Sequence, residues 1–136
     1  MLGRLTVRLR AGYGDAMEAR ETIARYAAIY RQREEERRDA LARRASALCA
    51  RLPEAAALLR ARFGATRVGV FGSLARGRFA EGSDVDLYVD HVAPGRYFEA
   101  VASLAALLDA DVDLVELDRA PASLRDLIAA EGQDVD

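Results

Sequence analysis

The sequence has no lysine and no tryptophan, and it contains only one cysteine, one histidine and three prolines. Without a lysine amine, neither a Walker-type phosphate loop nor a Schiff-base mechanism can operate. The single cysteine, Cys49, cannot form an internal disulfide, so a reducing compartment is expected and the sequence predicts a cytoplasmic protein. No apolar run reaches the ~18 residues of a membrane-spanning helix, so no membrane association is predicted.

Charges are unevenly distributed along the 136 residues, a length typical of one domain. Residues 1–62 carry 14 arginines and 8 acidic residues, whereas residues 63–136 carry 6 arginines and 14 acidic residues. The net charge of −2 therefore combines a basic first half with an acidic second half. Either the halves neutralise each other within the fold, or the basic half binds an acidic partner. Nucleic acid is not a favoured partner, because aromatic residues are not interleaved with the arginines.

Hydrophobic periodicity predicts an α/β (α+β) protein with a small mixed β-sheet and helices packed on it. The predicted elements are the strands Thr66–Phe71, Asp84–Asp90 and Asp111–Leu117, the short helix Ser73–Arg78, and the helices Pro53–Phe63, Pro94–Leu108 and Pro121–Glu131. The last six residues lack the apolar character of a core strand, so the sequence gives no support for a further strand there.

Residues 1–52 form a predicted N-terminal extension. Leu5–Leu9 alternates like a short strand, or like an arm that pairs with another chain. A helical pattern runs over Ala16–Leu52 as one helix or two, and Pro53 predicts that a separate helix begins there. The stretch 31–39 has no apolar residue, so it is either a solvated helical face or a surface for a partner or for self-association.

Three aspartates are candidate metal ligands. Asp84 and Asp86 lie two apart on a predicted strand, so both side chains project from one face. Two ionised carboxylates side by side repel each other, and a divalent cation such as Mg²⁺ removes that conflict. Asp113 completes the cluster if the third strand lies beside the second. Two ions held by shared carboxylates can grip the attacking and leaving oxygens of a displacement at phosphorus.

A Gly-Ser turn ahead of this strand is the candidate phosphate site. Gly72 allows the backbone to approach a ligand closely, and the amides that follow it can bind phosphate oxygens. Ser73 adds a hydroxyl donor, and Arg76, with Arg78 as a second candidate, can neutralise a triphosphate. Tyr88 lies on the same strand face and is either a packing residue or part of the nucleotide site.

These residues resemble the minimal nucleotidyltransferase family of the DNA polymerase beta-like nucleotidyltransferase superfamily. The family's third acidic residue corresponds to Asp113, and the resemblance covers about Pro53 to Gly132. Residues 53–136 are therefore expected to form the minimal nucleotidyltransferase domain. The family signature is a Gly-Ser pair, ten residues and an Asp-x-Asp pair, which stand here as Gly72, Ser73, Asp84 and Asp86.

The resemblance implies a metal-dependent transfer of AMP from ATP, with two Mg²⁺ ions and with pyrophosphate as the leaving group. Asp84 and Asp86 would bind metal, and Asp113 would bind metal and accept the proton of the acceptor hydroxyl. Gly72 and Ser73 would hold the triphosphate. Many small members of the family look like antitoxins paired with a HEPN toxin, so the implied acceptor is a tyrosine of such a toxin.

Two other functions stay open. A transferase acting on a small aminoglycoside-like alcohol needs an acceptor pocket, and the chain has little spare length to build one. A non-catalytic antitoxin that neutralises its toxin by contact alone would tolerate loss of the aspartates. A homo-oligomer formed through the N-terminal helix is compatible with each of these functions.

Overall fold

The structure is a computed structural model that describes residues 13–136, so the predicted strand Leu5–Leu9 lies outside the described residues. The chain divides into two compact units, Met1–Ala40 and Leu41–Asp136, which are described separately. Among the described helices, none combines the length and the apolar character needed to cross a membrane.

The first unit consists, within the described residues, of the beginning of helix α1, which spans Tyr13–Phe63. The charged stretch 31–39 is helical and mostly exposed, and Glu34 pairs with Arg37 at 3.4 Å. Exposed ion pairs at this spacing stabilise a helix by only ~0.3–0.5 kcal/mol. The stretch is an exposed part of a continuous helix, so Ala16–Leu52 forms one helix rather than two. Its use as a surface for a partner or for self-association stays a prediction.

The predicted break at Pro53 is wrong, because α1 continues through this proline to Phe63. A proline inside a helix removes one backbone hydrogen bond and costs ~3 kcal/mol. Burial of one large apolar side chain contributes about 1.5–3 kcal/mol, so several such residues outweigh this cost. Four large side chains on both sides of the proline are at most 7% exposed, namely Leu48, Leu52, Leu59 and Phe63.

The second unit confirms the α/β fold that the sequence predicts. Its four strands form one mixed sheet in the order β3-β2-β1-β4, in which only the β2–β3 pair is parallel. The fourth strand has two residues and was not predicted, since no apolar pattern marks it. After α1 the elements are β1 (Val68–Phe71), α2 (Gly72–Ala75), β2 (Val85–Val89), α3 (Tyr97–Leu108), β3 (Val112–Glu116), α4 (Ala122–Glu131) and β4 (Gln133–Asp134).

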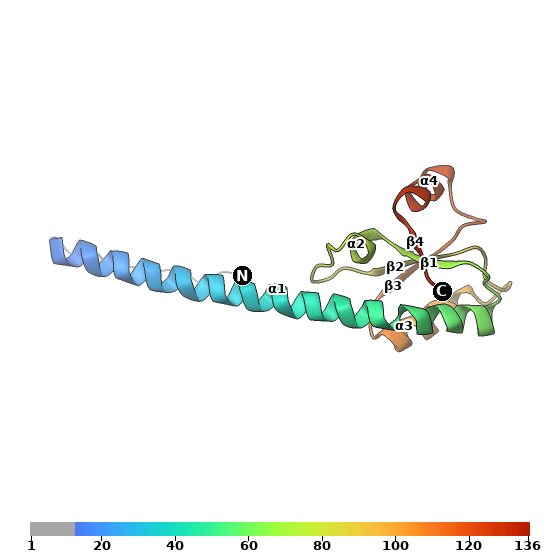
Figure 1. The fold of residues 1–136 in the computed structure, drawn as a ribbon, viewed down its shortest axis with the longest axis horizontal. Coiled ribbons are helices and arrows are strands. Elements are labelled where there is room, and N and C mark those ends of the chain that lie inside the picture. Colours follow the sequence, from blue (N-terminus) through green and yellow to red (C-terminus); the bar gives the residue numbers. More distant parts are fainter. Residues whose placement is uncertain (1–12) are drawn as a thin grey trace. The chain divides into compact units, whose positions relative to one another are not determined.

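Helices cover both faces of the sheet in this unit (Figure 1). The end of α1 and helix α3 cover one face, where the main core includes Val70, Leu87 and Leu114. Helix α4 covers the opposite face, where Ile128 packs against Tyr88. Successive strand residues alternate between faces, so the aspartates of β2 and β3 project towards the α4 side.

Arginines of α1 bind backbone carbonyls elsewhere in the second unit. Arg51 donates to the Leu107 carbonyl at 2.6 Å. Arg44 donates to the carbonyls of Leu108 and Asp109, at the end of α3. The last carbonyls of a helix lack partners within that helix, and these guanidinium groups supply them. Arg60 donates to the Val135 carbonyl at 2.7 Å. Some arginines of the basic first half are thus hydrogen-bonded to backbone carbonyls within the fold.

Asp90, directly after β2, ties the beginning of β1 to the sheet. Its carboxylate accepts the Thr66 amide at 3.0 Å, the Arg67 amide at 3.1 Å and the Thr66 hydroxyl. Burial raises the pKa of the Asp90 carboxyl, but these hydrogen bonds outweigh burial and hold that pKa well below its ordinary range. Such a lowered pKa stabilises the fold above about pH 4, and the stabilisation is lost as the pH falls further.

Replacing Asp90 with Asn is expected to lower the free energy of unfolding by about 1–3 kcal/mol at pH 7, because two amides lose a charged acceptor. The difference between native protein and variant should shrink progressively below about pH 4. Urea unfolding of both proteins at a series of pH values measures this difference. A difference that does not depend on pH would contradict the assignment.

Candidate active site

Asp86 and Asp113 are direct neighbours on adjacent strands. The parallel register of β2 and β3 pairs Asp86 with Asp113, while Leu87 and Leu114 pair on the core face. Asp84 immediately precedes β2, and both Asp84 and Asp113 are exposed, whereas Asp86 is half-buried. The third strand therefore lies beside the second, as the prediction for Asp113 required.

The electrostatics of Asp86 reflect this arrangement. Burial is the largest cause that raises the pKa of the Asp86 carboxyl, and the charges of Asp113 and Asp84 raise it further. The Arg76 guanidinium acts in the opposite direction. The three carboxylates therefore form one interacting acidic group, with a cation within electrostatic reach of its centre.

The Gly-Ser turn lies directly against Asp86. Gly72 has a φ of +71°, and a Cβ at this position would lie 2.1 Å from Oδ2 of Asp86. Only glycine satisfies both the backbone conformation and this close approach. The turn is closed by backbone hydrogen bonds from the Arg76 amide to the Gly72 carbonyl at 3.1 Å and from the Arg78 amide to the Ser73 carbonyl at 2.8 Å. The predicted phosphate site and the predicted acidic cluster are thus one continuous surface.

Arg76 follows α2 and lies at the edge of this surface. Its guanidinium is 3.8 Å from the Glu131 carboxylate at the end of α4, and its side chain is half exposed. An exposed pair at this distance contributes little stability, so Arg76 is free to exchange its carboxylate partner for another anion. The structure therefore brings Gly72 and Arg76 to the side of the sheet that carries Asp86.

The fit of a metal ion depends on the donors that the strands supply. Within residues 13–136, the side chains as they stand do not gather three His, Cys, Asp or Glu groups closely enough to hold an ion. The donor set nevertheless suits Mg²⁺, which takes carboxylate oxygens. Asp86 and Asp113 share one face of the sheet, and Asp84 directly precedes β2. Burial and then the charges of Asp113 and Asp84 raise the pKa of the Asp86 carboxyl, and a cation relieves the charge repulsion.

Tyr88 is a packing residue, which is one of the two roles that the sequence left open for it. It is 1% exposed beneath α4, and its hydroxyl donates to Asp134 of β4 at 2.6 Å. Arg67 pairs with the same carboxylate at 3.0 Å. A Cβ on Gly69 would lie 2.0 Å from the Tyr88 ring, so the ring occupies the space above this glycine. A glycine inside an apolar strand was the signal in the sequence for such an approach.

The second unit matches a known protein family. The family model described as polymerase beta, nucleotidyltransferase, matches residues 56–135, more than half of the chain. A protein adenylyltransferase, MntA, from Thermococcus cleftensis is 48% identical over 60 residues, which cover 42% of this chain and 61% of that protein. The chain therefore spans about three fifths of this curated relative.

Solved structures share the same fold. A minimal nucleotidyltransferase is 36% identical with a TM-score of 0.56, over 65% of this chain and 93% of that chain. A toxin–antitoxin complex with AMP-PNP contains a chain that is 32% identical with a TM-score of 0.52, over 57% of this chain and 65% of that chain. A chain from a second toxin–antitoxin complex, which contains MntA and carries a tyrosine-to-alanine substitution, matches at 30% identity with a TM-score of 0.53, over 60% of this chain and 68% of that chain.

Proposed function

We propose that this chain, which belongs to the polymerase beta nucleotidyltransferase family, transfers AMP from ATP to a hydroxyl group of a partner protein. One observation carries the proposal: Gly72 has no room for a side chain because the Asp86 carboxylate lies against it. A phosphate-binding turn and an acidic cluster in direct contact provide what nucleotidyl transfer needs, which is a grip on a triphosphate beside carboxylates that hold Mg²⁺.

Each residue has a stated role in this proposal. Gly72 and Ser73 hold the triphosphate, and Arg76 neutralises part of its charge. Asp84, Asp86 and Asp113 hold two Mg²⁺ ions, whose chemical contribution when bound is to neutralise the charge that develops on the phosphate oxygens.

Asp113 also accepts the proton of the acceptor hydroxyl, in the role of a general base. The hydroxyl oxygen then bonds to the α-phosphorus. The bond from that phosphorus to the bridging oxygen breaks, and pyrophosphate leaves.

The acceptor that we propose is a tyrosine of a HEPN-family toxin, with this chain as the antitoxin. Similarity to an adenylyltransferase, and to chains from toxin–antitoxin complexes, supports this partner. The first unit supports a protein contact as well, because Ile23, Tyr26 and Tyr30 are 45–52% exposed at helical spacing. This stripe could equally face a second copy of the chain, and size-exclusion chromatography with light scattering separates the two cases. The single cysteine favours the cytoplasm as the place of action.

The test is to incubate the chain with its HEPN partner, Mg²⁺ and ATP labelled either at the α-phosphate or at the γ-phosphate. AMP transfer moves the α-label onto the partner and leaves the γ-label in solution as pyrophosphate. Transfer of the γ-label would indicate a kinase instead. Retained binding of the partner without transfer of either label would favour an antitoxin that acts by contact alone, and label on an added aminoglycoside would favour the small-molecule transferase.

A further inference from the structure

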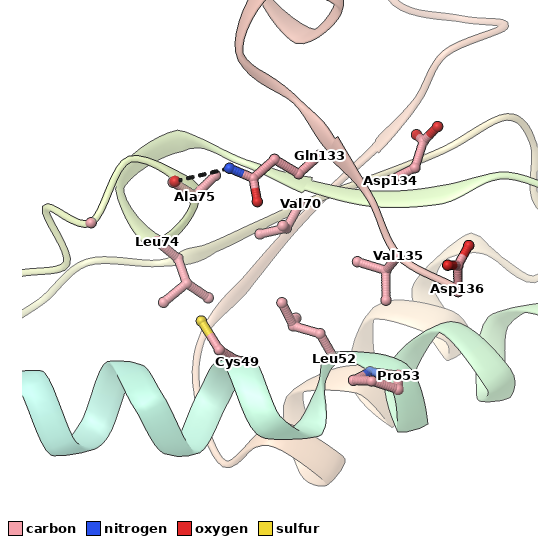
Figure 2. Close-up of a pocket in the computed structure, with 11 residues that line it drawn as sticks. Cys49, Leu52, Pro53, Val70, Leu74, Ala75, Gln133, Asp134, Val135 and Asp136 are labelled. Carbon is pink, nitrogen blue, oxygen red and sulfur yellow. Dashed lines mark hydrogen bonds between the residues drawn. The ribbon is translucent and has the colours of Figure 1, made fainter.

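The segment after α4 contacts the end of the phosphate-binding turn. The Gln133 side-chain amide, Nε2, donates to the carbonyl of Ala75 at 3.3 Å, as the dashed line in Figure 2 shows. Ala75 is the last residue of α2, the short helix that begins at Gly72. Two residues before Gln133, Glu131 pairs with Arg76 directly after this helix. Residues 131–133 therefore contact the C-terminal end of α2. They lie at the edge of the sheet that β4 forms beside β1.

Gln133 is itself held in place from both sides. Its backbone lies in β4 and pairs with Val70 of β1, the strand that leads into α2. The next residue, Asp134, accepts the Tyr88 hydroxyl, and this hydrogen bond is the largest cause that lowers the pKa of the Asp134 carboxyl. Arg67 pairs with the same carboxylate and lowers that pKa further. Because its neighbours are anchored to β1 and β2, the Gln133 amide is a fixed point for α2.

Leu74 anchors the buried side of helix α2 in the main core, where it is 5% exposed. The helix is four residues long and has no side-chain cap at its N-terminal end. A cavity of about 470 Å³ lies behind it, between α1 and the C-terminal residues, and Leu74 and Ala75 form part of the wall (Figure 2). The last residue of α2, Ala75, borders this cavity and is only partly buried, so packing holds this end less closely than it holds Leu74. The hydrogen bond from Gln133 contacts α2 at this less closely packed end.

We propose that Gln133 is a positioning residue for nucleotide binding. Its side-chain amide donates a hydrogen bond to the Ala75 carbonyl and so fixes the C-terminal end of α2. The first two residues of α2, Gly72 and Ser73, bind the triphosphate. Gln133 does not touch the nucleotide, and Arg76 can exchange Glu131 for the triphosphate. The inference rests on the proposed function, and it adds a residue that neither the Gly-Ser pair nor the aspartates reveal.

The test compares the affinity of a non-hydrolysable ATP analogue, with Mg²⁺ present, for native protein, Gln133→Glu and Gln133→Asn. Glutamate keeps the shape of glutamine but cannot donate at neutral pH, and asparagine can donate but is one methylene too short. Each variant should raise the Kd by about three- to tenfold, the range expected from loss of one hydrogen bond. The turnover rate at saturating ATP and the melting temperature should stay close to native values, because the catalytic groups are untouched.

Asp136→Asn is the matched control, since Asp136 lines the same cavity and is exposed. Its Kd should equal that of the native protein. Native protein that binds the analogue, with Gln133 variants that bind it equally well, would overturn the inference and leave the proposed function standing. Variants that melt lower and lose turnover in proportion would also overturn it, because Gln133 would then serve stability alone. Failure of the native protein to bind the analogue would refute the proposed function and the inference together.

Discussion

Replacing Asp86 with Asn is expected to reduce AMP transfer by about a thousandfold or more. Loss of a carboxylate that holds Mg²⁺ removes several kcal/mol of charge stabilisation in the transition state, and each 1.36 kcal/mol corresponds to about tenfold in rate. Asp84→Asn should have an effect of the same order. Single-turnover transfer of α-labelled AMP to the partner measures both variants, with Asp118→Asn as a control at an exposed aspartate beyond β3.

The same Asp86→Asn change should not destabilise the fold. The pKa of Asp86 is raised by burial and by two neighbouring carboxylates, so its ionisation is opposed in the folded state. A group with a raised folded pKa lowers stability as the pH rises above its ordinary range. The variant should therefore unfold at a higher urea concentration than the native protein at pH 7, and this gain should vanish at acidic pH. A loss of activity accompanied by a loss of stability would contradict the assignment.

Replacing Gly72 with Ala is expected to abolish transfer and to lower the free energy of unfolding by roughly 2–5 kcal/mol. A left-handed backbone costs a residue with a Cβ about 1–2 kcal/mol. The added methyl group would also lie 2.1 Å from the Asp86 carboxylate, and relief of such a clash costs about 1–3 kcal/mol. Urea unfolding and the labelled-AMP assay measure the two effects separately.

Gly77 provides a matched control for this prediction. It has a φ of +70°, close to the +71° of Gly72, but a Cβ there would meet no atom within 4 Å. Gly77→Ala should therefore show only the backbone cost and should keep most of the activity. Equal destabilisation of the two variants, with activity retained in both, would show that the turn and Asp86 are not in contact.

The fixed period of a strand was sufficient to predict that Asp84 and Asp86 lie on one face, whereas the place of Asp113 depended on a third strand lying beside the second. Alternation placed Asp84 and Asp86 on one face, and a parallel neighbour brought Asp113 beside Asp86. The positions of the glycine turn and of the strand cores followed from equally local patterns. The alternation and the turn depend on neighbouring residues along the chain, so the sequence was enough for them, but the pairing of Asp86 with Asp113 depends on which strands are adjacent.

Other features depended on contacts between distant residues. The local cost of Pro53 favoured a helix break, but the buried face of α1 on both sides of it favoured continuity, and packing prevailed. Strand β4 carries no apolar signature because its anchor is polar, a hydrogen bond between Asp134 and Tyr88. The contact from Gln133 to α2 joins residues 58 positions apart, which no local pattern could reveal. The predicted domain boundary between residues 52 and 53 stays a prediction.

Peptide mass spectrometry of the proposed HEPN partner tests the central claim most directly. After incubation with this chain, ATP and Mg²⁺, a tyrosine-containing peptide of the partner should gain the mass of one AMP group, and its unmodified form should be depleted. The Asp84→Asn and Asp86→Asn variants should leave that peptide unmodified while still binding the partner. An unmodified partner after incubation with active, correctly folded native protein would contradict AMP transfer as the function of this site.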